Sequence, residues 1–212
     1  MKRLFVPFVA LATTVLVFTS CGDESKPTIT LPEGALIIDL GAKEAALVGV
    51  KAEDKKNDLT DKIEVKGLDF VGVGVLEYVV SNDNGTTTEK RDVTIKADNL
   101  TGFTYRVKEG GASLPDATVS KSGDVTRLVI SGIISGVNFT FEGKGKEMSM
   151  TLVDPIRLND GDDTDPDWFG LEGKISYQKT SNGDYQIYRF EYTKTYEEDS
   201  ETFNVSLEFE KQ

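Results

Sequence analysis

The 212-residue sequence contains no histidine, one cysteine and one tryptophan. Histidine is the usual general base near neutral pH and the commonest metal ligand, so its absence excludes Ser-His-Asp and Cys-His catalysis and histidine-bound zinc. A single cysteine cannot form a disulfide within the chain. Carboxylate pairs of the kind that glycosidases use remain open, but the 36 acidic residues single out no such pair. We therefore expect a protein without catalytic activity.

Basic residues are fewer than acidic ones. The chain has 24 Lys and Arg residues against 36 Asp and Glu residues, and its formal net charge is −12. A surface this negative repels phosphate backbones, so nucleic acid is not an expected partner. The same charge keeps the folded part away from anionic headgroups, so a membrane anchor would have to be a lipid.

The N-terminus has the features of a secretory signal peptide. Lys2 and Arg3 precede an uncharged apolar run over residues 4–20. A transmembrane helix is the alternative, but it needs about 20 apolar residues. This run is shorter, and Pro7 interrupts it. The sequence predicts a leader over residues 1–20.

The cysteine lies directly after this leader. The stretch Phe18-Thr19-Ser20-Cys21 resembles the lipobox of bacterial lipoproteins, and the resemblance implies a thioether-linked lipid on Cys21 and an acylated N-terminus. A buried free thiol is the alternative. Several acyl chains anchor a protein lastingly without spanning the membrane. Asp23 and Glu24 resemble the export signal of Bacteroidetes surface lipoproteins, which implies the outer membrane, with the cell surface favoured over the periplasmic face. Residues 21–28 are then a lipidated tether.

The mature chain has the composition of an all-β protein. Runs rich in Val, Ile, Thr, Tyr and Phe alternate with Gly, Asn and Asp. Residues 35–52 offer two strands; the stretch between Gly41 and Gly49 has helical composition but is short. Residues 73–97 read as a hairpin with its turn at Asn84-Gly85.

Residues 27–97 carry the second resemblance. The patterns Tyr78-x-Val80-x-Asn82 and Arg91-x-Val93-x-Ile95 resemble a bacterial immunoglobulin-like surface domain. Gly74 departs from that pattern, since the family usually carries an aromatic residue there, and Asn82 replaces the usual Asp. The resemblance implies an immunoglobulin-like β-sandwich over residues 29–97, used as a spacer or interaction module.

Residues 98–212 form the second predicted domain. Phe203, Val205, Leu207 and Phe209 alternate with polar residues, as do Met148, Met150 and Leu152. Alternation of this kind predicts antiparallel strands with one wet face, in a sandwich or in a meander that closes into a barrel. The sequence of this part resembles uncharacterised Bacteroidetes lipoprotein domains, with no motif from which residue roles follow.

Two acidic stretches are candidate calcium sites. Asp160, Asp162 and Asp163 belong to an acidic run before the tryptophan, but the spacing is not that of an EF-hand, and a solvated hairpin loop is favoured. Asp54, Asp58 and Asp61 form the other stretch, and here a turn capped by Asn and Asp is favoured. No other cofactor is expected.

Aromatic residues are the candidate ligand contacts. Trp168 and Phe169 follow the acidic run, and Tyr188 lies in an aromatic segment in which Tyr185 and Ile187 alternate with Tyr188 and Phe190. Both faces of this strand cannot be core unless a bulge intervenes, so some rings are expected to be exposed. Exposed rings stack on sugars, whereas ordinary cross-strand packing is the alternative.

These observations together predict a membrane-anchored, non-catalytic surface lipoprotein. Its leading function is a binding module, for a glycan or as an accessory to nutrient uptake. The alternative is a structural or adhesive protein that contacts other surface proteins. An enzyme that uses carboxylates ranks last.

Overall fold

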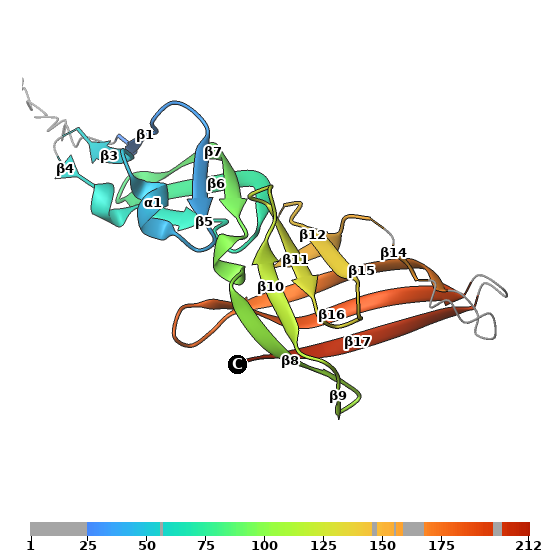
Figure 1. The fold of residues 1–212 in the computed structure, drawn as a ribbon. Coiled ribbons are helices and arrows are strands. Elements are labelled where there is room, and N and C mark those ends of the chain that lie inside the picture. The colour runs from blue at the N-terminus through green and yellow to red at the C-terminus, as the bar shows by residue number, and fades with distance from the viewer. Residues whose placement is uncertain (1–24, 56, 146–147, 155, 159–167, 197–200) are drawn as a thin grey trace, which may run out of the picture.

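The computed structural model describes residues 25–212 except 56, 146–147, 155, 159–167 and 197–200. Strands dominate these residues, so the predicted all-β fold class is confirmed. Figure 1 shows an N-terminal half with two small sheets and a barrel to its lower right. Within the described residues, no helix has both the length and the apolar character needed to cross a bilayer.

The N-terminal half contains two small sheets. The three-stranded sheet has the order β1 (Thr28–Thr30), β3 (Lys51–Asp54), β4 (Asn57–Asp58). The four-stranded sheet has the order β2 (Leu36–Asp39), β7 (Gly85–Lys96), β6 (Gly72–Asn82), β5 (Glu64–Lys66). Two short helices complete this half, α1 (Lys43–Leu47) and the 3-10 helix η1 (Thr60–Lys62).

The two faces of the four-stranded sheet differ. Leu76, Tyr78 and Val93 point into the core, as the period of two predicts. The opposite face exposes Val73 and Val75 of β6, with exposed fractions of 70% and 37%. Ile37 is exposed on the same face and belongs to β2, which pairs with β7 in parallel. This outer face therefore presents exposed aliphatic side chains beside the charged pair Glu77 and Lys90.

The β6–β7 hairpin turns one residue earlier than predicted. Asn82 pairs with Gly85, so Asp83 and Asn84 occupy the two turn positions and Gly85 begins the next strand. The side chain of Asn82 accepts a hydrogen bond from the backbone N–H of Asn84 at 2.9 Å. Asn at the first position and Gly at the fourth are favoured in type I turns, which explains the shift. Gly85 has a φ of 142°, which suits glycine.

The segment after β2 also differs from the prediction. A five-residue helix, α1, separates β2 from β3. Gly41 and Gly49 flank it with φ values of 75° and 74°, a conformation that favours glycine. Ala46 is fully buried, and its carbonyl accepts a hydrogen bond from the hydroxyl of Tyr78 at 3.0 Å. Tertiary contacts thus stabilise a helix that is too short to form alone.

The C-terminal part is an eight-stranded closed sheet. The strand order is β10-β11-β12-β13-β15-β16-β17-β8, and β8 closes the barrel by pairing with β10. All neighbouring pairs in the barrel are antiparallel. Two further strands lie beside it, with β9 against β8 and β14 against β15. The bounds are β8 (Phe103–Glu109), β9 (Ala112–Ser113), β10 (Ala117–Lys121), β11 (Arg127–Ser131), β12 (Asn138–Glu142), β13 (Ser149–Leu152), β14 (Ile156–Leu158), β15 (Trp168–Lys179), β16 (Tyr185–Tyr196) and β17 (Thr202–Lys211).

A bulge in β16 resolves the conflict between its two aromatic faces. Ser176 pairs with Arg189 but Tyr177 pairs with Ile187, so Tyr188 is an extra residue in β16. The bulge lets Ile187 and Phe190 both face the barrel core, where each is fully buried. Tyr188 itself is half-buried.

The N-terminal half and the barrel share one hydrophobic core. At their junction the backbone N–H of Val71 donates a buried hydrogen bond to the hydroxyl of Tyr177 at 2.9 Å. Gly72 and Gly143 bring the two backbones into contact, since a Cβ added at Gly72 would overlap the carbonyl of Gly143. The 3-10 helix η2 (Asp98–Leu100) connects the two parts, with Leu100 fully buried. A domain boundary at residues 97–98 stays a prediction, tested below.

Candidate functional site

The predicted aromatic contacts lie far apart. Trp168 and Phe169 begin β15 and pair with Tyr196 and Thr195 of β16. Tyr188 lies eight residues away along β16, which is about 26 Å at the usual rise of a strand. The barrel therefore does not bring Tyr188 and Trp168 into one site. The guanidinium of Arg189 lies 5.7 Å from the ring centre of Tyr188.

The acidic candidates divide into two cases. Asp160, Asp162 and Asp163 lie outside the described residues, as does Cys21. Asp58 accepts a hydrogen bond from the backbone N–H of Thr60 at 2.9 Å. The side chain of Thr60 above all, and then this backbone bond, lower the pKa of Asp58. That contact is the capped turn that the sequence favours. In the part of the chain that the structure describes, no group of three or more acidic or cysteine side chains is placed to hold a metal ion.

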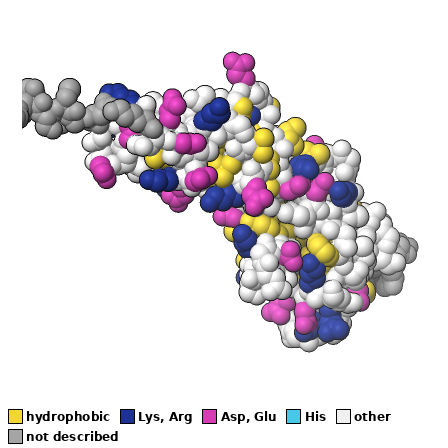
Figure 2. All heavy atoms as spheres, turned by 90° about the vertical axis from the view of Figure 1, so that its left-hand side faces the viewer, with side chains coloured by type: hydrophobic (Ala, Val, Ile, Leu, Met, Phe, Trp, Pro, Cys, Tyr) yellow, Lys and Arg dark blue, Asp and Glu magenta, His cyan; other side chains and the backbone are white. Residues whose placement is uncertain are grey.

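The most suggestive surface lies at the junction of the two parts. Two cavities of about 470 Å³ and 390 Å³ meet there and share Lys66, Gly67 and Asp69. We call them together the junction groove. The larger cavity adds Phe70, Val75, Glu77, Lys90 and Met148, and the smaller adds Gly41, Lys43, Val65, Leu68, Lys179 and Tyr185. Figure 2 shows hydrophobic side chains at the surface where the N-terminal half meets the barrel, with charged side chains around them.

The segment after β5 builds the wall of this groove. Gly67 has a φ of 87°, and a Cβ there would lie 3.0 Å from the carbonyl oxygen of Val75, so the chain runs close against β6. Phe70 then packs its ring against Gly74, where a Cβ would overlap that ring. Phe70 thus fills the space beside Gly74 that a side chain at position 74 would otherwise occupy.

Tyr185 ties this wall to the barrel. Its hydroxyl donates a hydrogen bond of 2.6 Å to the Asp69 carboxylate, and its ring lies against Gly41, where a Cβ would be 2.7 Å away. Burial, followed by the bond to Asp69, raises the pKa of Tyr185. Burial also raises the pKa of Tyr177, so both hydroxyls stay neutral and hold the groove in one shape over the physiological pH range.

The groove is basic although the chain is acidic. Its lining contains four lysines and two acids, against an overall net charge of −12. Lys90 pairs with Glu77 at 3.0 Å. Lys43 and Lys66 are exposed and form no ion pair with any described residue. The groove therefore offers unpaired positive charge above the apolar side chains of Val75 and Met148.

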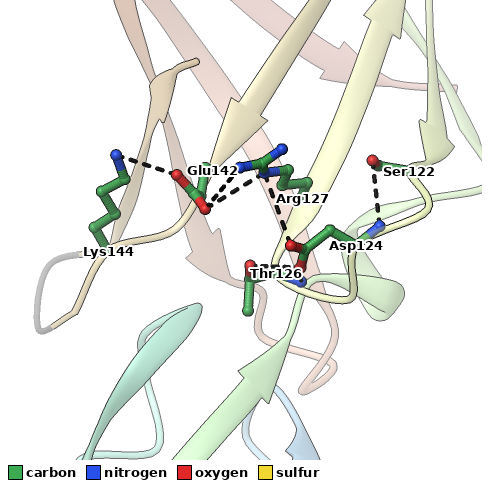
Figure 3. Close-up of polar contacts among 6 residues, drawn as sticks. All are labelled: Ser122, Asp124, Thr126, Arg127, Glu142 and Lys144. Atoms are coloured by element: carbon green, nitrogen blue, oxygen red, sulfur yellow. Dashed lines mark hydrogen bonds and ion pairs between the residues drawn. The ribbon is translucent and has the colours of Figure 1, made fainter.

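A polar network on the barrel supports the loop that reaches the junction. Figure 3 shows Glu142 between Arg127 and Lys144, at 3.2 Å and 3.1 Å. Asp124 accepts hydrogen bonds from the backbone and hydroxyl of Thr126 at 2.9 Å and 2.8 Å. Lys144 above all, and Arg127, lower the pKa of Glu142, and the backbone N–H of Thr126 lowers that of Asp124. The backbone N–H of Gly143 donates to Thr126, so the network fixes the glycine that contacts Gly72.

Two other cavities are larger but less distinctive. One of about 630 Å³ lies on β3 and β4 beside residue 56, which is outside the described set. The other, of about 570 Å³, lies on the wall of the barrel and is lined by residues of β13, β15, β16 and β17, including Glu172, Lys174 and Glu191. Lys174 and Glu191 form an ion pair of 3.6 Å, so the one lysine of this wall is already paired.

The sequence did not reveal the junction groove. Its lysines belong to α1, to β5, to β7 and to the end of β15, and no spacing relates them. Only the scarcity of basic residues in the chain makes a cluster of four lysines noteworthy. Phe70 carried no signal either, because its role depends on Gly74, which the sequence showed only as a departure from a pattern.

Comparisons with known proteins give weak structural likenesses alone. No protein-family model matches the chain, and no curated protein matches it. A crystal structure of the lipoprotein BT2262 from Bacteroides thetaiotaomicron is similar over 86% of this chain and 99% of that one, with 15% sequence identity and a TM-score of 0.31. A likeness at this level carries no argument about fold or function.

Proposed function

We propose that this protein is a lipid-anchored, non-catalytic binding protein that holds a glycan in the junction groove, as an accessory to nutrient uptake. The observation that carries the proposal is the groove itself. Side chains from both parts of the molecule line one basic surface, and a buried and a partly buried hydrogen bond hold those parts together. Ligand sites commonly lie at such junctions between structural units.

The anchor rests on the sequence of the N-terminus. The basic start, the apolar run and the lipobox-like stretch before Cys21 support lipidation of that cysteine. Asp23 and Glu24 support export to the outer membrane, with the cell surface favoured over the periplasmic face. The net charge of −12 supports a fold that stands away from anionic headgroups, with the lipid as its membrane contact.

The N-terminal half is proposed to be the immunoglobulin-like spacer. Two small sheets and a parallel pairing between β2 and the long strand β7 support this proposal. The ring of Phe70 packed on Gly74 supports it further, because it supplies the aromatic packing that the sequence pattern lacks. A spacer of this kind would place the groove away from the membrane.

The exposed aliphatic residues favour a second function. Ile37, Val73 and Val75 are exposed on the outer face of the four-stranded sheet, with Thr94 of β7 between Ile37 and Val73, and we call this surface the apolar strip. Apolar strips of this kind are typical of protein contact surfaces. The alternative is therefore an adhesive or structural protein that contacts another surface protein through this strip.

A tryptophan scan of two exposed valines tests the binding site. Val75 lines the groove and Val48 does not, yet both are exposed on the N-terminal half. The full-length lipidated protein in detergent would be run by affinity electrophoresis in gels containing neutral or acidic polysaccharides. We expect Val75→Trp to abolish the retardation of the wild type and Val48→Trp to leave it unchanged. Equal retardation of both variants, or no retardation of the wild type by any polysaccharide, contradicts the proposal.

A further inference from the structure

We propose that the junction groove selects acidic oligosaccharides, whose carboxylates pair with Lys43, Lys66 and Lys179. This inference rests on the proposed function and adds the class of ligand to it. Neutral sugars have no charge for these lysines to bind. An acidic sugar presents both the carboxylate and an apolar C–H face.

Three lysines are available to a ligand because the protein leaves them largely unused. Lys43 and Lys66 form no ion pair among the described residues. Lys179 lies over the ring of Tyr185 at 5.9 Å from its centre. The fourth lysine of the groove, Lys90, already pairs with Glu77 at 3.0 Å and contributes less.

The acids of the groove do not cancel this charge. Asp69 is turned to the barrel, where it accepts the 2.6 Å hydrogen bond from Tyr185. Glu77 is held by Lys90. The groove therefore keeps a local excess of two positive charges in a chain whose net charge is −12. Charges further away than about 8 Å are largely screened at physiological ionic strength, so this local excess decides what binds.

The shape of the groove favours a sugar over an acidic peptide. Peptides that bind to sheets usually add a strand to a free edge. The edge strand here, β5, has only three residues and carries Glu64 and Lys66, and short charged edges resist strand addition. The apolar side chains of Val75 and Met148 instead give a small floor on which the C–H face of a sugar ring can lie.

Ion pairs between the lysines and the ligand have to supply the affinity that stacking on aromatic rings does not. The two aromatic residues of the groove, Phe70 and Tyr185, are each only 3% exposed, so neither ring is a platform for a sugar. An exposed ion pair contributes about 0.2–1 kcal/mol. Losing one lysine should therefore weaken binding about 1.4- to 5-fold, and losing two about 2- to 30-fold.

The test measures Kd by titration calorimetry on the full-length protein in detergent, with oligogalacturonate as the probe. Its methyl-esterified form has the same sugar backbone without the charges. The groove variant Lys43→Gln/Lys66→Gln is matched by Lys51→Gln/Lys62→Gln, which removes two exposed lysines of the same half outside the groove. Lys179→Gln tests the contribution of the barrel.

We expect the acidic probe to bind, the ester to bind at least 10-fold more weakly, and higher salt to weaken only the acidic probe. The groove double variant should lose about 2- to 30-fold and Lys179→Gln about 1.4- to 5-fold, while the control double variant keeps the affinity of the wild type. Circular dichroism confirms that each variant is folded.

Four results would overturn the inference, and they separate it from the proposed function. If the ester binds as well as the acid and Val75→Trp still abolishes binding, the groove binds sugars without selecting charge. If polyglutamate binds as tightly as oligogalacturonate and depends on the same lysines, the ligand is an acidic peptide. If neither form of the sugar binds, the proposed function fails with it. Equal losses in the groove and control double variants also overturn the inference, because the effect is then one of net charge.

Discussion

Replacing Tyr177 with phenylalanine tests how firmly the two parts are joined. The hydroxyl of Tyr177 accepts the buried hydrogen bond from Val71 at 2.9 Å, and both residues are almost wholly inaccessible to water. Phenylalanine keeps the ring, including its packing against Tyr185 at 6.5 Å between centres, so little or no cavity is created. The variant instead leaves the N–H of Val71 buried without a partner.

An unsatisfied buried donor costs about 1–3 kcal/mol, and a central value of about 2 kcal/mol lowers the melting temperature of a chain of this size by about 4–8 °C. Chemical denaturation followed by the fluorescence of the single tryptophan and by far-UV circular dichroism measures the change. The tryptophan reports the barrel and the dichroism reports both parts. We expect the two signals to change together in the wild type, since the parts share one core.

Tyr188→Phe is the matched control. Tyr188 is half-buried on the same strand pair, and its hydroxyl makes no hydrogen bond within the described residues. Its removal should change stability by less than about 0.5 kcal/mol. The reasoning is refuted if Tyr177→Phe and Tyr188→Phe destabilise equally, because the loss would then not come from the bond to Val71.

The remaining predictions concern the anchor, acid stability and the domain boundary. Cys21→Ser should abolish labelling by palmitate and partition into detergent; persistent labelling would show that Cys21 is not the lipidation site. The pKa values of Asp124 and Glu142 are lowered in the folded state, so their stabilisation is present above the unfolded pKa and is lost as the pH falls through the folded values. Melting temperatures between pH 7 and 3 should therefore drop in acid, and less steeply in Glu142→Gln; parallel curves would contradict this. Limited proteolysis should release a resistant C-terminal fragment that begins near Ala97. The cleavage should be slow because Ala97 and Leu100 are buried, and it should be faster in Tyr177→Phe. One resistant core spanning both parts, unchanged in the variant, would contradict a boundary at 97–98.

Local patterns in the sequence predicted the strands, whereas contacts between distant residues decided the rest. Val205, Leu207 and Phe209 are buried, as their period of two predicts. The bulge at Tyr188 was visible only as a conflict between two aromatic faces, because its position depends on the partner strand. The closure of the barrel between β8 and β10 had no signal of its own in the sequence.

The candidate site was less predictable than the fold for the same reason. Tyr185 and Asp69 are far apart in the chain and meet only because the N-terminal half rests on the barrel. Clustered aromatic residues are a sequence pattern typical of ligand contacts, so the sequence predicted a site at such residues. Single lysines such as Lys43 and Lys179 predict no site, because their role depends on neighbours that only the fold brings together.

The hydrogen bonds just after the N-terminal segment set how far the molecule can stand from its anchor. The carbonyl of Ser25 accepts a bond of 2.9 Å from Asn82, and the carbonyl of Pro27 accepts one from Thr87. The fold therefore holds the chain by hydrogen bonds from Ser25 onward, four residues after Cys21, and four residues span at most about 14 Å. A lipid on Cys21 would thus hold the β6–β7 hairpin close to the bilayer and limit its swing, so that neighbouring molecules in one leaflet would present their grooves at a common height.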